Sequence, residues 1–192
     1  MFDLERLLQS NIKFISGGLF TSYDEWIHPK RIIDSFEIIV MVKGTLFITE
    51  DDTPYEVHEN EILILKPGVE HFGTKSTTEK ISFYWIHLIS DYGQLYHLGK
   101  QHFSLSGINH LIVLIKQMLH YANTPEYPQK CTDYVISLIL VELMIPRDAE
   151  TGHEPVSSEI REWIKMHYDK KITLDDISKQ FGYNKDLSLI HI

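Results

Sequence analysis

Eleven histidines and one cysteine are the first residues in this sequence that could support chemistry. The histidines are spread along the chain without the close spacing of a metal-binding motif: His28, His58, His71, His87, His97, His102, His110, His120, His153, His167 and His191. Cys131 falls on the apolar side of a predicted helix, where a buried thiol is expected rather than a nucleophile. The pair Gly17-Gly18 lacks the further residues of a phosphate-binding loop. We therefore expect no catalytic residue, no metal ligand set and no cofactor.

The aromatic segment 81–89, ISFYWIHLI, is the best candidate for a ligand-binding wall. Successive side chains of a strand point to opposite faces, so Phe83, Trp85 and His87 share one face. The sequence leaves open which face turns inward, and whether Phe83 and Trp85 bind a ligand or only pack the core. An indole stacked on the apolar side of a sugar ring would contribute affinity.

Two further candidates for effector binding, Trp26 and Arg31, lie much earlier in the chain, in segment 23–34. The guanidinium of Arg31 has a fixed fork of donors that could hold hydroxyl groups or a carboxylate. This segment is expected to behave as an arm, which makes both residues weaker candidates than Phe83 and Trp85.

Five short runs predict the strands that must position these side chains. They are rich in β-branched and aromatic residues and cover 36–42, 45–49, 55–58, 62–66 and 81–89. Turn residues such as Gly44 and Pro67-Gly68 separate them. Parallel strands would need helices between them, so a mainly β fold is predicted over residues 1–106, as an antiparallel sandwich or barrel.

The periodicity changes after residue 107, where two amphipathic helices are predicted over 108–122 and 131–145. Their apolar stripes, which a dimer would bury, are Leu111, Ile115, Met118 and Leu119 in the first helix, and Tyr134, Leu138, Val141 and Ile145 in the second. Segment 146–156 contains two prolines and a glycine and predicts a linker between the helical segment 107–145 and a last domain, 157–192.

That last domain predicts a short helix followed by a turn. Thr173 can cap the helix, with Asp176 three residues later in the position of a capping box. Ile177 and Phe181 share a face, and Gly182 supplies the left-handed residue that ends the helix. A helix, a glycine turn and a polar restart are typical of the first half of a helix-turn-helix.

Composition limits the classes of protein that this chain can be. Its 192 residues are 43% hydrophobic, enough for a packed core, and its net charge of −9 argues against a general polyanion binder. Segment 1–10 lacks the basic start and apolar run of a signal peptide, and no apolar stretch reaches the roughly 20 residues that a membrane span needs. With a single cysteine, a cytoplasmic protein is expected.

Two parts of the sequence resemble the AraC/XylS family of transcription regulators. The segment ITLDDISKQFGYNKD is similar to the start of the family's first helix-turn-helix. The segment GTLFITEDDTPYEVHENEILILKPGVEHFG, followed by FYWIHL, is similar to its cupin-type (double-stranded β-helix) effector barrel, with Gly44, the Pro67-Gly68-x-x-His71 turn and a Trp-Ile-His strand end. The helices over 108–145 fall where that family places its dimerisation helices.

The resemblance implies an effector-responsive, sequence-specific DNA-binding regulator that acts as a homodimer. A sugar or another small polar effector would bind in the barrel, with Trp85 at a position that lies against the ligand in similar sugar-responsive regulators. His71 would either line this pocket or be a hydrogen-bonded residue at the barrel lip. Thr173, Asn184 and Lys185 would lie in the DNA-binding part.

Two features depart from this family and its fold relatives. Only 36 residues follow Val156, so most of the DNA-reading module is missing and operator binding by this exact chain is expected to be poor or absent. Metal-using cupins carry a His-x-His pair, a glutamate and a later histidine, of which only His71 matches clearly, with Glu37 and His58 as distant possibilities. The alternatives are a metal-dependent cupin enzyme, either an isomerase or a dioxygenase, and a metal-free sensor or dominant-negative dimer partner.

Overall fold

The computed structural model describes residues 4–93, 95, 101–105, 108–145, 160, 163, 164, 167 and 172–181. The chain divides into two compact units, 1–147 and 148–192. The predicted linker 146–156 and the predicted DNA-binding residues Asn184 and Lys185 lie outside the described residues. The predicted domain boundaries therefore stay predictions.

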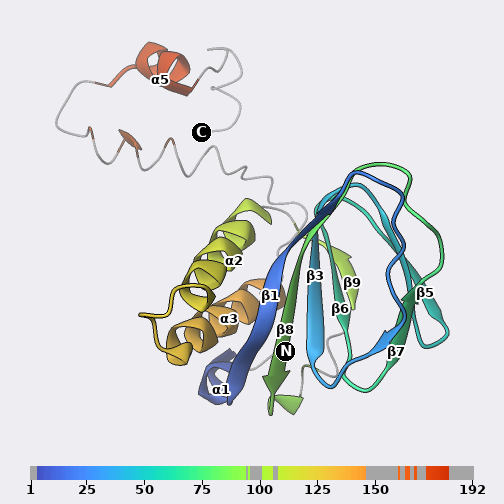
Figure 1. Cartoon of the computed structure of the whole chain (residues 1–192). Coiled ribbons are helices and arrows are strands. Elements are labelled where there is room, and N and C mark those ends of the chain that lie inside the picture. Colours follow the sequence, from blue (N-terminus) through green and yellow to red (C-terminus); the bar gives the residue numbers. More distant parts are fainter. Residues whose placement is uncertain are drawn as a thin grey trace. The chain divides into compact units, whose positions relative to one another are not determined.

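The first unit is built on two antiparallel sheets that face each other (Figure 1). The five-stranded sheet has the order β1-β8-β3-β6-β9, and the four-stranded sheet has the order β2-β7-β4-β5. The strands are β1 (Ile12–Ser22), β2 (Arg31–Ile32), β3 (Phe36–Lys43), β4 (Leu46–Glu50), β5 (Thr53–Val57), β6 (Glu61–Leu65), β7 (Glu70–Gly73), β8 (Ile81–Ser90) and β9 (His102–Ser104). This architecture confirms the predicted cupin-like β fold.

The five predicted strand runs correspond to β3, β4, β5, β6 and β8, with ends that differ by one or two residues. β2 and β9 are too short to show a period, and β7 consists of the four residues EHFG, which carry no apolar alternation. β1 was not among the predicted strand runs, because Gly17 and Gly18 interrupt its apolar pattern.

The five-stranded sheet is buried on both faces, and strand alternation assigns each side chain to one of two cores. Ile38, Tyr84 and Ile86 belong to the core that the sheet forms with the helices. Ile39 and Phe83 belong to the second core, between the two sheets, and Trp85 packs against it. The structure therefore shows which face of segment 81–89 turns into the barrel: it is the face that carries Phe83 and Trp85.

Three helices lie on the other side of the five-stranded sheet: α1 (Leu4–Gln9), α2 (Ile108–Ala122) and α3 (Gln129–Met144) (Figure 1). The predicted stripe of α2 does not face a free surface, since Leu111, Ile115 and Met118 are fully buried in the monomer core. The predicted apolar stripe of α3 is partly exposed, since the side chains of Tyr134 and Leu138 are 64% and 48% exposed.

α3 is fastened to β1 at a β-bulge between Phe14 and Ser16. The backbone amide of Phe14 donates to the buried Asp133 carboxylate at 3.1 Å, and Gln129 Nε2 donates to the Phe14 carbonyl at 3.0 Å. A bulge leaves backbone groups without ladder partners, and these two side chains of α3 satisfy both groups of Phe14.

In the second unit, α5 (Leu174–Phe181) has the predicted capping box. The Asp176 amide donates to Thr173 Oγ1 at 3.3 Å, and the Thr173 amide donates to Asp176 Oδ2 at 2.9 Å. Ile177 is buried, and the ring of Phe181 lies edge-on to that of Trp163, with 6.1 Å between centroids. None of the described helices is long and apolar enough to cross a membrane.

Gly44 is predicted to be a position that only glycine tolerates. Its φ is +80°, and an added Cβ would lie 2.5 Å from the Lys80 carbonyl oxygen. Gly44→Ala should lower the free energy of unfolding by about 2–4 kcal/mol, measured by urea denaturation. Gly68→Ala is the matched control, since its φ is +76° but the space around it is open, and about 1 kcal/mol is expected. Equal losses for both variants would contradict the steric argument.

Candidate functional site

A buried polar group lies between the two sheets and consists of His28, Glu37 and His71. One ligand-type atom from each residue lies within 4.8 Å of the others. The three residues are 5%, 3% and 0% exposed, so water hardly reaches them. Each comes from a different part of the barrel: Glu37 from β3, His71 from β7, and His28 from the connection between β1 and β2.

Strand register brings Glu37 and His71 to this point. Glu37 precedes Ile39 and Met41 by two and four residues and thus shares their barrel-facing side of β3. His71 pairs with Arg31 across β2 and β7, and with Glu50 across β4 and β7.

His28 reaches the group because its backbone approaches β7 closely. The Gly73 amide donates to the His28 carbonyl at 2.9 Å, and a Cβ on Gly73 would lie 2.6 Å from the His28 nitrogen. The preceding Trp26 is fixed by backbone hydrogen bonds to Thr77 in both directions, at 3.2 and 2.8 Å. The expected arm 23–34 is therefore joined to the barrel at these two points.

Burial sets the protonation states of the group. It raises the pKa of Glu37 to about 7, although the charge of Arg31 partly opposes this. It lowers the pKa of His28 to about 4 and lowers the pKa of His71 as well, so both imidazoles are neutral at pH 7. His87 has a pKa lowered by burial and by the charge of Arg31.

Several polar atoms of the group have no hydrogen-bond partner among the described residues. They are Glu37 Oε2 and both ring nitrogens of His71. Glu37 Oε2 is 3.8 Å from His71 Nε2, and Glu37 Oε1 is 3.8 Å from His87 Nε2, both too long for a hydrogen bond. Buried polar atoms without partners are rare in proteins and point to a bound water, ion or ligand.

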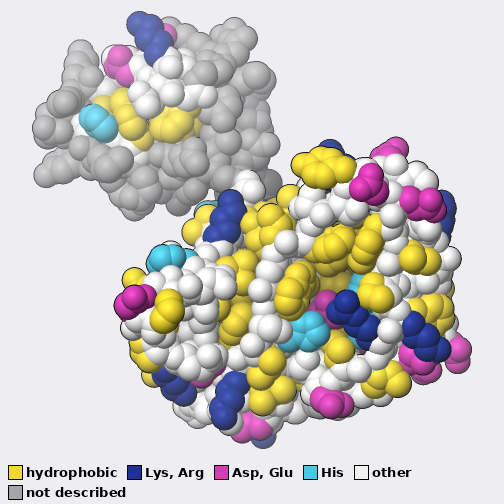
Figure 2. Space-filling model, viewed as in Figure 1, with side chains coloured by type: hydrophobic (Ala, Val, Ile, Leu, Met, Phe, Trp, Pro, Cys, Tyr) yellow, Lys and Arg dark blue, Asp and Glu magenta, His cyan; other side chains and the backbone are white. Residues whose placement is uncertain are grey.

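An aromatic wall continues from this group into the barrel. Ring centroids are 4.6 Å apart for Phe20 and Trp26, 5.8 Å for Trp26 and Phe83, and 5.7 Å for Trp26 and His28. Trp85 contacts His87 edge-on at 5.4 Å. Figure 2 shows hydrophobic, histidine, acidic and basic side chains gathered together on one face of this unit.

The structure brings the five predicted effector residues into one region. Trp26, Phe83 and Trp85 belong to or pack against the core between the sheets, His71 is in the polar group, and Arg31 lies beside His71 in the β2–β7 pair. Their role in binding stays a prediction. Of the predicted DNA-binding residues, Thr173 is described, and its side chain caps α5.

The sequence analysis missed His28 and gave Glu37 little weight. No local signal marks His28, because its position depends on the approach of its backbone to Gly73, 45 residues later. His87 was placed on the strand face of Phe83 and Trp85 but was not among the predicted effector residues.

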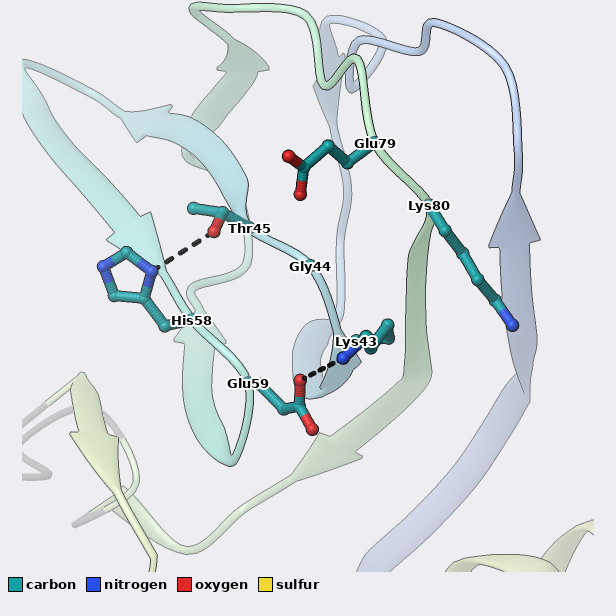
Figure 3. A pocket seen from close by; sticks show the side chains of 7 residues that line it. All are labelled: Lys43, Gly44, Thr45, His58, Glu59, Glu79 and Lys80. Atoms are coloured by element: carbon teal, nitrogen blue, oxygen red, sulfur yellow. Dashed lines mark hydrogen bonds and ion pairs between the residues drawn. The ribbon is translucent and has the colours of Figure 1, made fainter.

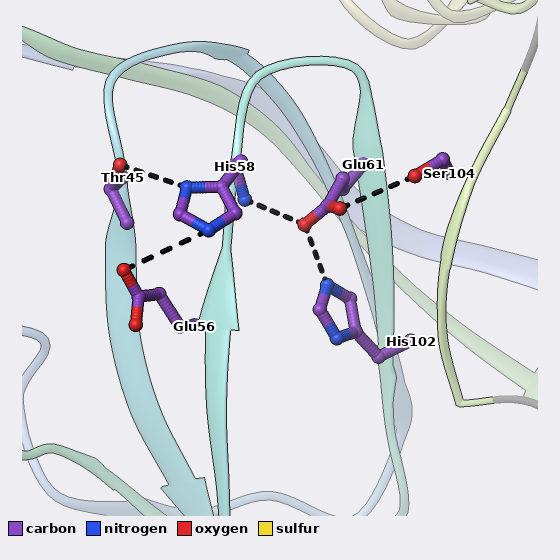
Figure 4. Close-up of polar contacts among 6 residues, drawn as sticks. All are labelled: Thr45, Glu56, His58, Glu61, His102 and Ser104. Atoms are coloured by element: carbon purple, nitrogen blue, oxygen red, sulfur yellow. Dashed lines mark hydrogen bonds and ion pairs between the residues drawn. The ribbon is translucent and has the colours of Figure 1, made fainter.

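His58, the other distant metal candidate, lies in an exposed network instead (Figure 4). Its ring contacts Thr45 Oγ1 at 3.2 Å and Glu56 at 3.7 Å, and its amide donates to Glu61 at 2.8 Å. Glu61 also accepts hydrogen bonds from His102 at 2.8 Å and Ser104 at 3.2 Å. This network joins β9 to the start of β6.

A surface pocket of about 330 Å³ lies next to this network, at the turn between β3 and β4 (Figure 3). Its lining residues are Lys43, Gly44, Thr45, His58, Glu59, Glu79 and Lys80. Lys43 and Glu59 form an ion pair at 3.2 Å across it. None of the predicted effector residues lines this pocket.

Comparison with known proteins assigns the class. Residues 16–126, more than half of the chain, match the family model of the AraC-like ligand binding domain. The chain is 27% identical over 200 residues to the uncharacterized HTH-type transcriptional regulator YisR of Bacillus subtilis (strain 168), covering 90% of this chain and 69% of that protein.

Two solved structures can be compared with the whole chain and with the barrel. ToxT from Vibrio cholerae covers 93% of this chain and 74% of its own at 15% identity, with a TM-score of 0.41. An RmlC-like cupin protein from Methanocaldococcus jannaschii covers 41% of this chain and 78% of its own at 14% identity, with a TM-score of 0.34.

Fold and family match together define a ligand-binding β barrel with helices packed on its five-stranded sheet. The chain belongs to the AraC-like ligand binding domain family, and it is a transcription regulator of the AraC type.

The contribution of Glu61 to the stability of the fold is predicted to be larger at neutral pH than at acidic pH. Burial acts to raise its pKa, but hydrogen bonds from the His58 amide, His102 and Ser104 outweigh this and lower the pKa. A lowered pKa in the folded state stabilises the protein above the pKa of the unfolded chain, and the gain is lost as the pH falls through the folded value. Glu61→Gln should cost about 1–2 kcal/mol in urea denaturation at pH 7, and less below pH 4.

Glu56→Gln is the control for this prediction, because the Glu56 side chain is 58% exposed and pairs with His58 only at 3.7 Å. It should change stability by less than about 0.5 kcal/mol. If Glu61→Gln lowers the free energy of unfolding by the same amount from pH 7 to pH 3, the charge of Glu61 does not contribute to stability.

Proposed function

We propose that the barrel binds a small polar effector in the region formed by Trp26, Arg31, His71, Phe83 and Trp85, and that this binding controls transcription in the cytoplasm. The observation that supports the proposal is the convergence of these five residues, which are spread over 60 residues of sequence, around one buried polar group. A site of this kind combines an apolar wall with a few fixed polar groups, as small-molecule sites generally do.

The chemistry of the site favours an effector with an apolar face and several hydroxyl groups, such as a sugar. The indole of Trp85 and the ring of Phe83 offer flat apolar surfaces. His71 has ring nitrogens that can hydrogen-bond a hydroxyl, and Arg31 can donate to hydroxyl or carboxylate oxygens.

We propose that effector binding reaches the helices through β1. The indole of Trp85 lies against Gly18 of β1, with a Cβ at Gly18 only 3.2 Å from it. The same strand carries Phe14, which α3 holds through Asp133 and Gln129. An effector that moves the indole would therefore change the packing of α3, by no more free energy than its differential affinity for the two states.

The proposed dimer surface is the exposed side of α3. Tyr134, Leu138 and Ile145 are 64%, 48% and 39% exposed, while the stripe of α2 is used inside the monomer. Exposed apolar residues repeated along one helix face are typical of a protein interface. In the full-length regulator, DNA binding would involve Thr173, Asn184 and Lys185.

The enzyme alternative has less support. The family match and the Bacillus subtilis relative both point to a regulator, and cupin-type fold likeness alone does not imply catalysis.

The effector site is tested by a thermal-shift screen of sugars, polyols and small carboxylates against the full chain. A ligand of the barrel should raise the melting temperature, and Trp85→Ala or Arg31→Gln should weaken its binding about tenfold, on the order of 1.4 kcal/mol. Trp163→Phe, in the second unit, is the control and should leave the affinity unchanged. A ligand that binds Trp85→Ala and Arg31→Gln as tightly as the wild type would contradict the proposed site.

The dimer surface is tested by sedimentation at about 20 μM, a concentration at which micromolar dimers are populated. Leu138→Glu places a charge on the exposed apolar stripe and should convert the dimer to a monomer. Ile89→Glu makes the same change at another exposed apolar residue, on β8, which is 41% exposed, and should leave the dimer intact. A wild-type chain that sediments as a monomer would rule out the proposed surface.

A further inference from the structure

The three buried residues His28, Glu37 and His71 have the composition and spacing of a metal site. Their ligand-type atoms lie within 4.8 Å of one another. Two ligands of one Zn²⁺ ion at about 2.1 Å from it are roughly 3.0–3.5 Å apart. Small rotations of the side chains, which move these atoms by about 1 Å, would therefore suffice to close the site around a cation.

The donor atoms of this group are free to bind. His28 Nδ1 donates to the Pro29 carbonyl at 2.8 Å, which leaves the lone pair on Nε2. Glu37 Oε2 and both ring nitrogens of His71 are buried and make no hydrogen bond of ordinary geometry among the described residues, although the Val69 backbone interacts with the His71 ring.

We propose that His28, Glu37 and His71 bind one divalent first-row transition metal ion, of the Zn²⁺ or Co²⁺ type, inside the barrel. Two imidazoles and one carboxylate suit these ions, whereas Ca²⁺ and Mg²⁺ prefer sites made of oxygen ligands alone. This site goes beyond the proposed effector function and does not require it.

The surroundings of the site are of mixed charge. Arg31 is close enough to lower the pKa values of His28, Glu37 and His71, and it works against a cation. The buried carboxylate of Glu50 has the opposite influence on His71. Arg31 is exposed, so water screens its charge more than that of the buried carboxylates.

A metal at this point would link three parts of the barrel through one ion. Glu37 belongs to the five-stranded sheet, His71 to the four-stranded sheet, and His28 to the connection between β1 and β2. Binding would add a link between the two sheets and a further constraint on the segment of Trp26, which backbone hydrogen bonds to Thr77 already hold. It would also leave coordination positions for water or for an oxygen of a ligand in the barrel.

The experiment is a titration of the chelator-treated full chain with Zn²⁺ by calorimetry and with Co²⁺ by visible absorption. We expect one equivalent to bind with a micromolar or tighter Kd, and the melting temperature to rise. His28→Asn removes one ligand from a segment outside both sheets and should weaken binding at least tenfold, with an unchanged circular dichroism spectrum. Glu37→Gln should weaken it as well.

The matched control is the double variant His58→Asn/His102→Asn. It removes both histidines of the exposed network, each of which contacts a glutamate and could bind metal weakly at the surface (Figure 4). This variant should bind the metal like the wild type. Loss of binding in the double variant with full binding in His28→Asn would overturn the proposal.

X-ray absorption of the Co²⁺-loaded wild-type chain gives a readout that depends on no variant. Two imidazole ligands together with oxygen ligands are expected. Absence of binding at 100 μM metal, or a shell with sulfur or with more than two imidazoles, would overturn the proposal.

Discussion

The organisation of the barrel depends on the burial of both faces of the five-stranded sheet. Each residue of β3 and β8 must face either the helices or the space between the sheets, and a shift by one residue would exchange the two sets. Apolar side chains fill nearly all of these positions, such as Ile38 and Ile86 on one side and Ile39 and Phe83 on the other. On β3 the exception is Glu37, a carboxylate in a run that is otherwise apolar and buried, and on β8 Ser82 and His87 are polar as well.

The same sheet also connects the barrel interior with the helices. On its inner face the indole of Trp85 touches the backbone of β1 at Gly18, and at the end of β1 the bulge at Phe14 is held by Asp133 and Gln129 of α3. A displacement of the indole must be absorbed by a strand whose other end has little freedom, because both backbone groups of Phe14 are satisfied by α3. The indole contact at Gly18 and the hydrogen bonds at Phe14 lie four residues apart on one strand, so the barrel interior and α3 share this element.

The sequence predicted the elements whose own pattern specifies them. β3, β8 and the two long helices have clear apolar periods, and the capping box of α5 is local. The site was predicted only in part, because it depends on distant pairing. Glu37 and His71 meet through register across two sheets, and His28 joins them only because Gly73 has no side chain to block its backbone. The stripe of α2 was assigned to a dimer for a similar reason, since helical periodicity shows which face is apolar but not what covers it.

The polar group also explains why the barrel interior is suited to binding rather than only to packing. Glu37 Oε2 and the His71 ring, buried without a hydrogen bond of ordinary geometry among the described residues, cost the folded state free energy that an apolar residue of similar volume would not. Burial has moved the pKa of Glu37 to about 7 and that of His28 to about 4, which measures how poorly these groups are solvated. A bound species that donates hydrogen bonds or positive charge recovers this cost.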